Sequence, residues 1–408
     1  MPDTPQPEVL QAIVSKVFRI EQVVTGDERQ FLVLYRGNLY SEDSEAAYDR
    51  LAAELLPFEI TPLFRLVKGR QEVILVKGVR RPTMGSLTVN IVMFILTVLS
   101  VLFAGAWYDY RGPVPDSDLE LVMAILPHIW QGWPFAVSLL SILLAHEFGH
   151  YFAGRHHRTA VSLPYFIPFP VSTLGTMGAF INMKEVPRNK RVLFDIGIAG
   201  PLAGLVVAIP VLIIGLLNSP IGEVQDSVHQ TADGVSYTLS YDDGLEGNSL
   251  LYLGLKYAIK QELLPAPDNY GDTPALYYWA RFMLTGQPIP IGGRDVHLDS
   301  VAWAGWAGLL VTFLNLIPAG QLDGGHILYA VFDRRVRIVP TLIIIALIIM
   351  GFFWRGWFIW AALIFLLGRA HAEPLDQITR LDPRRKALAA LTLFIFILVL
   401  TPIPFSVY

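Results

Sequence analysis

The chain has 408 residues, of which 53% are hydrophobic and only 16% are charged. Soluble domains usually carry about 25% charged residues, and the apolar residues here are gathered in long blocks, so the composition favours a membrane protein. The net charge of -4 argues against a nucleic-acid partner, which would need a basic surface. The absence of cysteine excludes disulfides and thiolate metal sites. Any transition-metal site must therefore use histidine and carboxylate ligands.

Residues 1–85 differ from the rest, because they are charged and contain no apolar run of membrane length. The first residues are polar and acidic, which predicts that no signal peptide is cleaved. The patterns predict two helices, at 8–17 and from Ser41 as N-cap to about Leu56, and strands at 18–24, 30–35, 58–67 and 72–76. These elements form a small α+β domain of roughly 70–80 residues, near the lower size for an independent core.

Long apolar blocks recur through residues 86–408. Seven of them approach the ~20 residues that cross ~30 Å of hydrocarbon, and we predict spans at about 87–107, 133–156, 193–217, 300–317, 338–354, 356–369 and 387–402. The short segment Asp323–Phe332 is expected to be a helix inside the protein. The predicted fold class is therefore mainly α, a polytopic membrane protein of about seven transmembrane helices.

The charges outside these spans predict an orientation. Basic clusters stand at Lys77/Arg80/Arg81, Arg155/Arg158, Lys184–Arg191, Arg334–Arg337 and Arg380–Lys386, whereas 109–120 and 219–299 are acidic or mixed. With seven spans, every basic cluster falls on one side, which the positive-inside rule makes cytoplasmic. We therefore expect a multi-pass protein of the cell membrane with a cytoplasmic N-terminal domain and an extracytoplasmic Tyr408. The polar insertion 219–299, with helical patches near 249–263 and 275–285, is then extracytoplasmic.

The segment SILLAHEFGHYFAGRHH contains the pattern His-Glu-x-x-His at His146, Glu147 and His150. On a helix the two histidines lie at i and i+4, on one face, so both imidazoles can reach one Zn²⁺. Glu147 stands beside the first histidine and can take a proton from metal-bound water. The pattern therefore predicts a zinc site with Glu147 as the general base.

The position of this motif in an apolar span supports a functional role. Glu147 lies roughly 14 Å along the axis from the cytoplasmic end of the predicted helix. Ionisable groups at such depth are energetically unfavourable and usually mark functional sites. The alternative is a pair of buried, hydrogen-bonded histidines beside a neutralised glutamate.

A catalytic zinc of this type needs a third protein ligand and an open position for water. The best candidate is Asp323 in FLNLIPAGQLDGGHI, where Gly324 and Gly325 allow close backbone approach. Asp323 can equally be the cap of the short helix that follows it, and one side chain can fill both roles. His326 is the rival ligand.

These two motifs together resemble a known family. His146-Glu147-Phe148-Gly149-His150, followed by Asn315-x-x-Pro318-x-x-x-x-Asp323-Gly324-Gly325, looks like the paired motifs of the site-2 protease family of intramembrane metalloproteases. The resemblance covers about residues 86–370. It implies that His146, His150 and Asp323 ligate one zinc per chain, with Glu147 as general base. It also implies that Asn315 lies near the metal and stabilises the oxyanion or positions the substrate. On the residues alone, Asn315 can be a polar contact between helices.

The apolar segment within 158–191 is broken by proline and glycine, and such backbone is tolerated at membrane depth only when buried or lining a cavity. Gly175-Thr176-Met177-Gly178-Ala179-Phe180-Ile181 resembles the family's membrane-embedded strand. The resemblance implies that an extended substrate, a transmembrane segment of another protein, binds at Gly175, Thr176, Met177 and Gly178 through main-chain hydrogen bonds. The alternative is an ordinary glycine-rich turn.

Two further segments bear on the branch of the family. Gly200-Pro201-Leu202-Ala203-Gly204 resembles the family's Gly-Pro segment, although many relatives have asparagine where Gly204 stands. Gly37-Asn38-Leu39-Tyr40 is close to the GNLR element of the EGY-like branch known from chloroplasts and cyanobacteria, from which Tyr40 departs. No insertion resembles a PDZ domain, which other branches carry.

Two other classes of protein fit parts of the pattern. A membrane di-iron desaturase or hydroxylase could use His146, His150, His156 and His157, but it needs further histidine-rich segments, and the remaining histidines are isolated. A non-catalytic transporter or scaffold could hold a metal at mid-membrane, but it would not require Glu147 beside His146. The sequence leaves the oligomeric state open.

Overall fold

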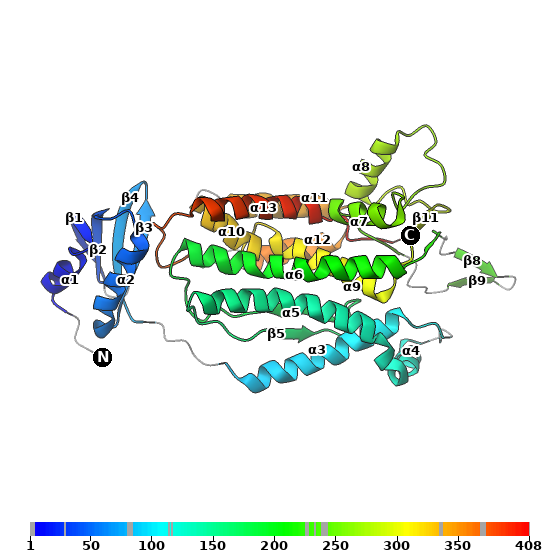
Figure 1. The fold of residues 1–408 in the computed structure, drawn as a ribbon, viewed down its shortest axis with the longest axis horizontal. Coiled ribbons are helices and arrows are strands. Elements are labelled where there is room, and N and C mark those ends of the chain that lie inside the picture. Colours follow the sequence, from blue (N-terminus) through cyan, green and yellow to red (C-terminus); the bar gives the residue numbers. More distant parts are fainter. Residues whose placement is uncertain are drawn as a thin grey trace.

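The computed structural model describes residues 5–27, 30–79, 85–112, 115, 117–224, 228–231, 234–237, 244–333, 338–367 and 373–407. Figure 1 shows three regions along the long axis: a small sheet domain at one end, a helical bundle, and a mixed region at the other end beside the C-terminus. The predicted basic residues Arg80, Arg81 and Arg334–Arg337, the last two residues of the predicted span 356–369 and Tyr408 lie outside the described residues.

The N-terminal region is the small α+β domain that the sequence predicts. Its elements are α1 (Pro7–Val14), β1 (Phe18–Thr25), β2 (Val33–Leu39), α2 (Ser44–Leu55), the 3-10 turn η1 (Leu56–Phe58), β3 (Ile60–Val67) and β4 (Arg70–Lys77). All neighbouring strands are antiparallel, in the order β1-β2-β4-β3. Tyr48 of α2 packs edge-on against Phe64 of β3 in the core, with ring centroids 5.4 Å apart.

The predicted N-cap of α2 is wrong by two residues. Asp43 is the N-cap, and its side chain accepts a hydrogen bond from the backbone N–H of Ala46. Ser41 instead accepts a hydrogen bond from the backbone N–H of Asp43, at 3.1 Å. Both residues favour helix starts, and Ser41 stabilises the turn that leads to the cap.

The outer edge of β3 is covered by a segment from near the end of the chain. The N–H of Phe64 donates to the carbonyl of Leu375 at 2.9 Å, and the N–H of Gln377 donates to the carbonyl of Phe64 at 3.1 Å. Between them, Asp376 is fully buried and accepts hydrogen bonds from the hydroxyls of Ser44 and Thr379. Residues 375–377 therefore fix the sheet domain to the bundle.

The bundle is built on long apolar helices. α3 (Leu87–Tyr108), α5 (Trp133–His156) and α6 (Lys190–Asn218) lie close to predicted spans. α5 follows directly on α4 (Asp118–Ile125) and the 3-10 segment η2 (Leu126–Gly132). Among the described residues, three helical stretches are long and apolar enough to cross a membrane: Leu87–Tyr108, Asp118–His156 and Lys190–Asn218.

The remaining bundle helices are α9 (Ser300–Leu316), α10 (Asp323–Phe332), α11 (Val339–Met350), α12 (Gly356–Leu367) and α13 (Pro383–Val399). Among them, α9 and α11 are shorter than the predicted spans, whereas α13 begins and ends earlier than its predicted span. α11 and α12 have 12 residues each, about 18 Å of helix, which is less than ~30 Å of hydrocarbon. The structure therefore confirms a mainly helical protein, in which three of the described helical stretches have membrane length. α10 is the short helix expected after the fourth apolar block.

A hairpin lies between the bundle helices. β5 (Tyr165–Pro168) pairs antiparallel with β6 (Thr176–Phe180), which falls in the predicted strand segment. Figure 1 shows β5 between α3 and α5. The Asn90 side chain of α3 donates to the carbonyls of Leu163 and Pro164, and the Ser100 hydroxyl donates to the carbonyl of Gly175. These bonds hold the hairpin against α3 and satisfy backbone that would otherwise be unpaired in an apolar setting.

The insertion 219–299 contains the two helices that the sequence predicts. Its elements are β7 (Ile221–Glu223), β8 (Val228–Thr231), β9 (Gly234–Tyr237), β10 (Gly244–Glu246), α7 (Leu250–Lys260), α8 (Ala275–Thr285) and β11 (Arg294–Val296). β10 pairs with β12 (Phe405–Val407), next to the C-terminus. The insertion is therefore part of one structure with the end of the chain.

A buried charge cluster joins three elements of the insertion. Lys256 of α7 is fully buried, with its Nζ 3.4 Å from Glu246 Oε1 and 3.5 Å from Asp295 Oδ1. One ammonium thus faces two carboxylates. Burial, opposed by Lys256 and aided by Glu246, raises the pKa of Asp295 from 3.8 to about 7.

This pKa predicts a pH-dependent stability. The folded state binds more protons than the unfolded state between about pH 4 and pH 7, so stability falls as pH rises through that window and levels off above it. Asp295→Asn removes the titrating group and should raise the melting temperature at pH 8, relative to wild type, by on the order of 5 °C, with a smaller gain at pH 5. Thermal unfolding of both proteins in detergent at the two pH values measures this. An equal shift at both pH values would contradict the assigned titration.

Candidate metal centre

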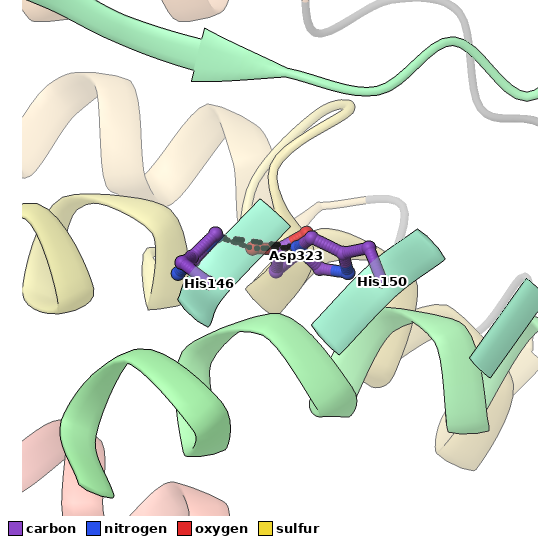
Figure 2. A group of neighbouring side chains, drawn as sticks. All are labelled: His146, His150 and Asp323. Atoms are coloured by element: carbon purple, nitrogen blue, oxygen red, sulfur yellow. Dashed lines mark hydrogen bonds and ion pairs between the residues drawn. The ribbon is translucent and has the colours of Figure 1, made fainter. Parts of the chain in front are cut away.

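Three helices supply the side chains of the motifs. α5 carries His146, Glu147 and His150, α9 carries Asn315 in its last turn, and α10 begins at Asp323. Both histidines and Glu147 are buried, with 3–5% of their surface exposed. Figure 2 shows the Asp323 carboxylate between the two imidazoles, on the face of α5 where the i, i+4 spacing places them.

The donor atoms are spaced as a tetrahedral metal site requires. Asp323 Oδ2 lies 3.3 Å from His146 Nε2 and 3.3 Å from His150 Nε2. The two Nε2 atoms are 3.2 Å apart. Tetrahedral zinc with bonds of about 2.0–2.1 Å to nitrogen and oxygen separates its ligand atoms by about 3.3 Å. These three residues form a possible metal-binding group, and their donor set and spacing fit Zn²⁺ with one position left open.

The surroundings orient the imidazoles for such a role. His150 Nδ1 lies 2.7 Å from the carbonyl oxygen of Ile196 in α6, so the proton of the neutral ring is held on Nδ1 and Nε2 keeps its lone pair. Asn315 Nδ2 lies 3.3 Å from His146 Nε2. The predicted proximity of Asn315 to the metal group is therefore present in the structure.

The backbone around Asp323 explains the two glycines after it. A Cβ on Gly324 would lie 2.0 Å from the carbonyl oxygen of Leu316, and one on Gly325 would lie 2.5 Å from that of Gly320. Asp323 is the first helical residue, and no side chain caps this helix end. The contacts of the Asp323 carboxylate with both imidazoles favour the ligand interpretation over the capping one.

Glu147 lines the same cavity as the metal group. Its Oε2 is buried and has no hydrogen-bond partner among the described residues. An unpaired buried carboxylate oxygen is rare in folded proteins because it is energetically unfavourable. It is available to accept a hydrogen bond from a water molecule in that cavity.

A cavity of about 450 Å³ opens onto the metal group. Met177 and Phe180 of β6 line one wall, and Trp360, Leu363 and Ile364 of α12 line another. Of the predicted substrate-binding residues, Met177 is 64% exposed, while Gly175 and Thr176 are buried. Gly178 has φ 93°, and a Cβ there would meet nothing within 4 Å. The hairpin thus presents only part of the predicted segment to the cavity.

The other histidines take different positions. His326 lines the cavity but lies outside the metal group found among the described residues. His157 Nε2 lies 2.8 Å from the carboxylate of Asp195, which also accepts hydrogen bonds from Arg385. His157 therefore takes part in a link between α5, α6 and α13.

Gly200 is a site residue whose role the sequence did not reveal. A Cβ there would lie 2.0 Å from His150 Nε2, closer than any real contact. Gly200→Ala is therefore expected to displace the His150 ring and to lower zinc affinity by about 10–100-fold or more. Zinc content after dialysis against a competing chelator measures this. Gly254→Ala on α7, where a Cβ meets nothing within 4 Å, is the matched control, and equal zinc retention by the two variants would disprove the expected clash.

Comparison with known proteins identifies the family. The family model described as "Peptidase family M50" matches residues 134–354, which include both motifs. The chain is 28% identical over 338 residues to "Probable zinc metalloprotease EGY1, chloroplastic" of Oryza sativa subsp. japonica, covering 79% of this chain and 51% of that protein. It is 30% identical over 297 residues to "Probable zinc metalloprotease EGY2, chloroplastic" of Arabidopsis thaliana, covering 72% and 46%.

The chain spans about half the length of the curated relatives it matches. The matches agree with the resemblance carried by the two motifs and by the Gly37–Leu39 element. The chain belongs to peptidase family M50, the site-2 protease family, within its EGY-like branch.

Proposed function

We propose that this chain is an intramembrane zinc metalloprotease that hydrolyses peptide bonds within or near transmembrane segments of other membrane proteins. The observation that carries the proposal is the metal group of His146, His150 and Asp323, with donor spacings that fit zinc, beside the unpaired Oε2 of Glu147. The names of its relatives as probable zinc metalloproteases support it.

Each residue has a role in the proposed hydrolysis. His146, His150 and Asp323 would hold one Zn²⁺ per chain, which lowers the pKa of its bound water towards ~7 and polarises the scissile carbonyl. Glu147 takes the proton of the attacking water on Oε2 and passes it to the leaving amine. Asn315 Nδ2 donates a hydrogen bond to the oxygen on which negative charge develops.

The substrate is proposed to bind in extended form along β6, because a helix hides its carbonyls from attack. Gly175, Thr176, Met177 and Gly178 are the proposed contacts, of which Met177 lies on the cavity and Gly178 has open space around it. Main-chain hydrogen bonds to a strand edge hold a peptide with little dependence on its sequence.

We further propose a topology of seven spans, formed by α3, α5, α6, α9 and α13 and by the apolar segments 338–354 and 356–369, which contain α11 and α12. Residues 1–85 form a cytoplasmic domain, 86–408 the membrane domain, and 219–299 an extracytoplasmic insertion, in a multi-pass protein of the cell membrane. The basic residues Arg188 and Arg191 pair with Asp49 and Glu45 of the N-terminal domain, which supports a common, positively charged cytoplasmic side.

Purified full-length protein, reconstituted with a panel of single-span membrane proteins, tests the proposed activity. We expect about one zinc per chain, cleavage of at least one panel member, loss of cleavage with a zinc chelator, and recovery when zinc is returned. Two irons per chain would instead favour a di-iron enzyme. Cleavage that a chelator leaves unchanged would overturn the zinc mechanism.

A further inference from the structure

The helix α8 of the insertion exposes an apolar face. Leu276 is 83% exposed, Tyr277 59% and Leu284 60%, and Ala280 between them is also exposed. Leu276, Ala280 and Leu284 are four residues apart and therefore form one stripe along the helix. Arg281 is the one charged residue of α8. A surface helix normally turns polar residues outwards, so exposure of this apolar face to water is energetically unfavourable.

The opposite face of α8 is already packed. Tyr278 and Phe282 are 4–5% exposed and form a cluster with Val224 and Leu245 of the insertion. The turn after α8 lies against the C-terminal segment, because a Cβ on Gly286 would come 2.6 Å from the Ser406 hydroxyl. The helix is therefore fixed in place, and its outward face is not covered by the described part of the chain.

The position of α8 along the bundle is set by its neighbours. A cavity of about 340 Å³ is lined both by Thr285–Gln287 and by the turn from α11 to α12, Phe353–Gly356. Phe352 and Phe353 in that turn are 79% and 54% exposed. The apolar stripe of α8 thus lies near apolar surface at the end of two bundle helices.

Figure 1 shows that α8 projects from the side of the bundle, across the direction of α5 and α6. α4 lies at the same end of the bundle on the opposite side. It too has outward apolar residues, Leu119 at 72% and Met123 at 61% exposed, and Trp130 and Trp133 follow it with 63% and 58%. Exposed tryptophans and laterally placed apolar helices are typical of the boundary between membrane and water.

We propose that α8 lies in the extracytoplasmic boundary of the lipid bilayer. The acyl chains next to the extracytoplasmic headgroups then surround the side chains of Leu276, Tyr277 and Leu284. Arg281, together with the exposed Arg355 beside the cavity, reaches the lipid phosphates. The insertion is then a membrane-anchored element rather than a domain surrounded by water. This inference rests on the proposed membrane placement of the bundle and is independent of proteolysis.

Lipid explains this surface better than a protein partner does. The stripe lies beside the exposed phenylalanines of the α11–α12 turn, and α4 repeats the arrangement on the far side of the bundle. A partner bound to α8 alone would leave the matching face of α4 unexplained, whereas a single bilayer plane covers both.

Site-specific labelling tests the proposal, because the chain contains no cysteine. Leu276→Cys and Leu284→Cys, each labelled with an environment-sensitive fluorophore, are reconstituted in phosphatidylcholine nanodiscs with and without brominated acyl chains. Ile359→Cys, on the 65% exposed site in α12, is the lipid-facing control, and Asp272→Cys, in the exposed loop before α8, is the water-facing control.

We expect brominated lipid to quench the labels at 276 and 284 by at least half as much as the label at 359, and to leave the label at 272 unchanged. Labels at 276 and 284 that behave like the one at 272, and are quenched by aqueous iodide instead, would overturn the proposal and favour a protein partner. An unquenched label at 359 would overturn the membrane placement, and this inference with it. Two reporter positions guard against one substitution that impairs folding.

Discussion

Glu147→Gln is expected to lower peptide hydrolysis by about 10²–10⁴-fold, the usual contribution of a positioned general base. Glutamine has nearly the same shape as glutamate but cannot accept the proton of an attacking water at neutral pH. The Oε2 atom that the substitution changes is buried and has no partner among the described residues. No existing hydrogen bond of that atom is therefore lost, and the fold should be retained.

The zinc content decides what a loss of activity in Glu147→Gln means. The variant should still bind about one zinc per chain, since the donor atoms of His146, His150 and Asp323 are unchanged. Glu223→Gln, at an exposed carboxylate of β7, should cleave as wild type does. Wild-type cleavage by Glu147→Gln would refute the proposed general base. Fragments and bound proteins recovered with this variant from cells would also identify substrates.

Asp323→Ala is expected to remove zinc almost completely and to abolish hydrolysis. Two histidines alone leave the metal with two protein ligands, fewer than the three of known catalytic zinc sites. If Asp323 were only a helix cap, its removal would cost about 1 kcal/mol of stability and leave zinc in place. The two interpretations therefore predict opposite metal contents.

Metal analysis and thermal unfolding with added zinc measure the effect of Asp323→Ala. Wild type should gain thermal stability as zinc rises, because a ligand that binds the folded state stabilises it, and the variant should not. Asp323→Asn keeps a side chain that can cap the helix but removes the charge. Full zinc occupancy in both variants would show that a different residue completes the site, with His326 in the cavity as the first to examine.

The sequence predicted the central residues of the site well. α5 begins and ends at the predicted residues, 133 and 156, because a long, predominantly apolar segment admits few other structures. The i, i+4 spacing then placed His146 and His150 on one face. The meeting of Asp323 with these histidines depends on how α10 packs on α5 and α6. Residue spacing alone could not predict this contact, whereas the family resemblance implied that Asp323 is the third ligand.

Other features depended on contacts between distant segments, which no local pattern encodes. Gly200 matters because α6 passes close to His150, and the wall formed by Trp360, Leu363 and Ile364 exists only once α12 packs beside β6. The apolar blocks at 338–354 and 356–369 were predicted as full spans. α12 begins at the predicted residue, Gly356, but α11 ends at Met350 instead of residue 354. Hydrophobicity alone does not predict that a helix ends at a glycine such as Gly351.

The segment 375–377 that covers the edge of β3 has a consequence for biosynthesis. The N-terminal sheet leaves the ribosome first, but the backbone groups that pair with Phe64 belong to Leu375 and Gln377. The edge of β3 therefore stays open until the chain has been made as far as residue 377, after most of the bundle helices. A chain interrupted before this segment would expose an unpaired strand, a common starting point for aggregation. The N-terminal sheet domain can thus be completed only after most of the helical bundle has been synthesised.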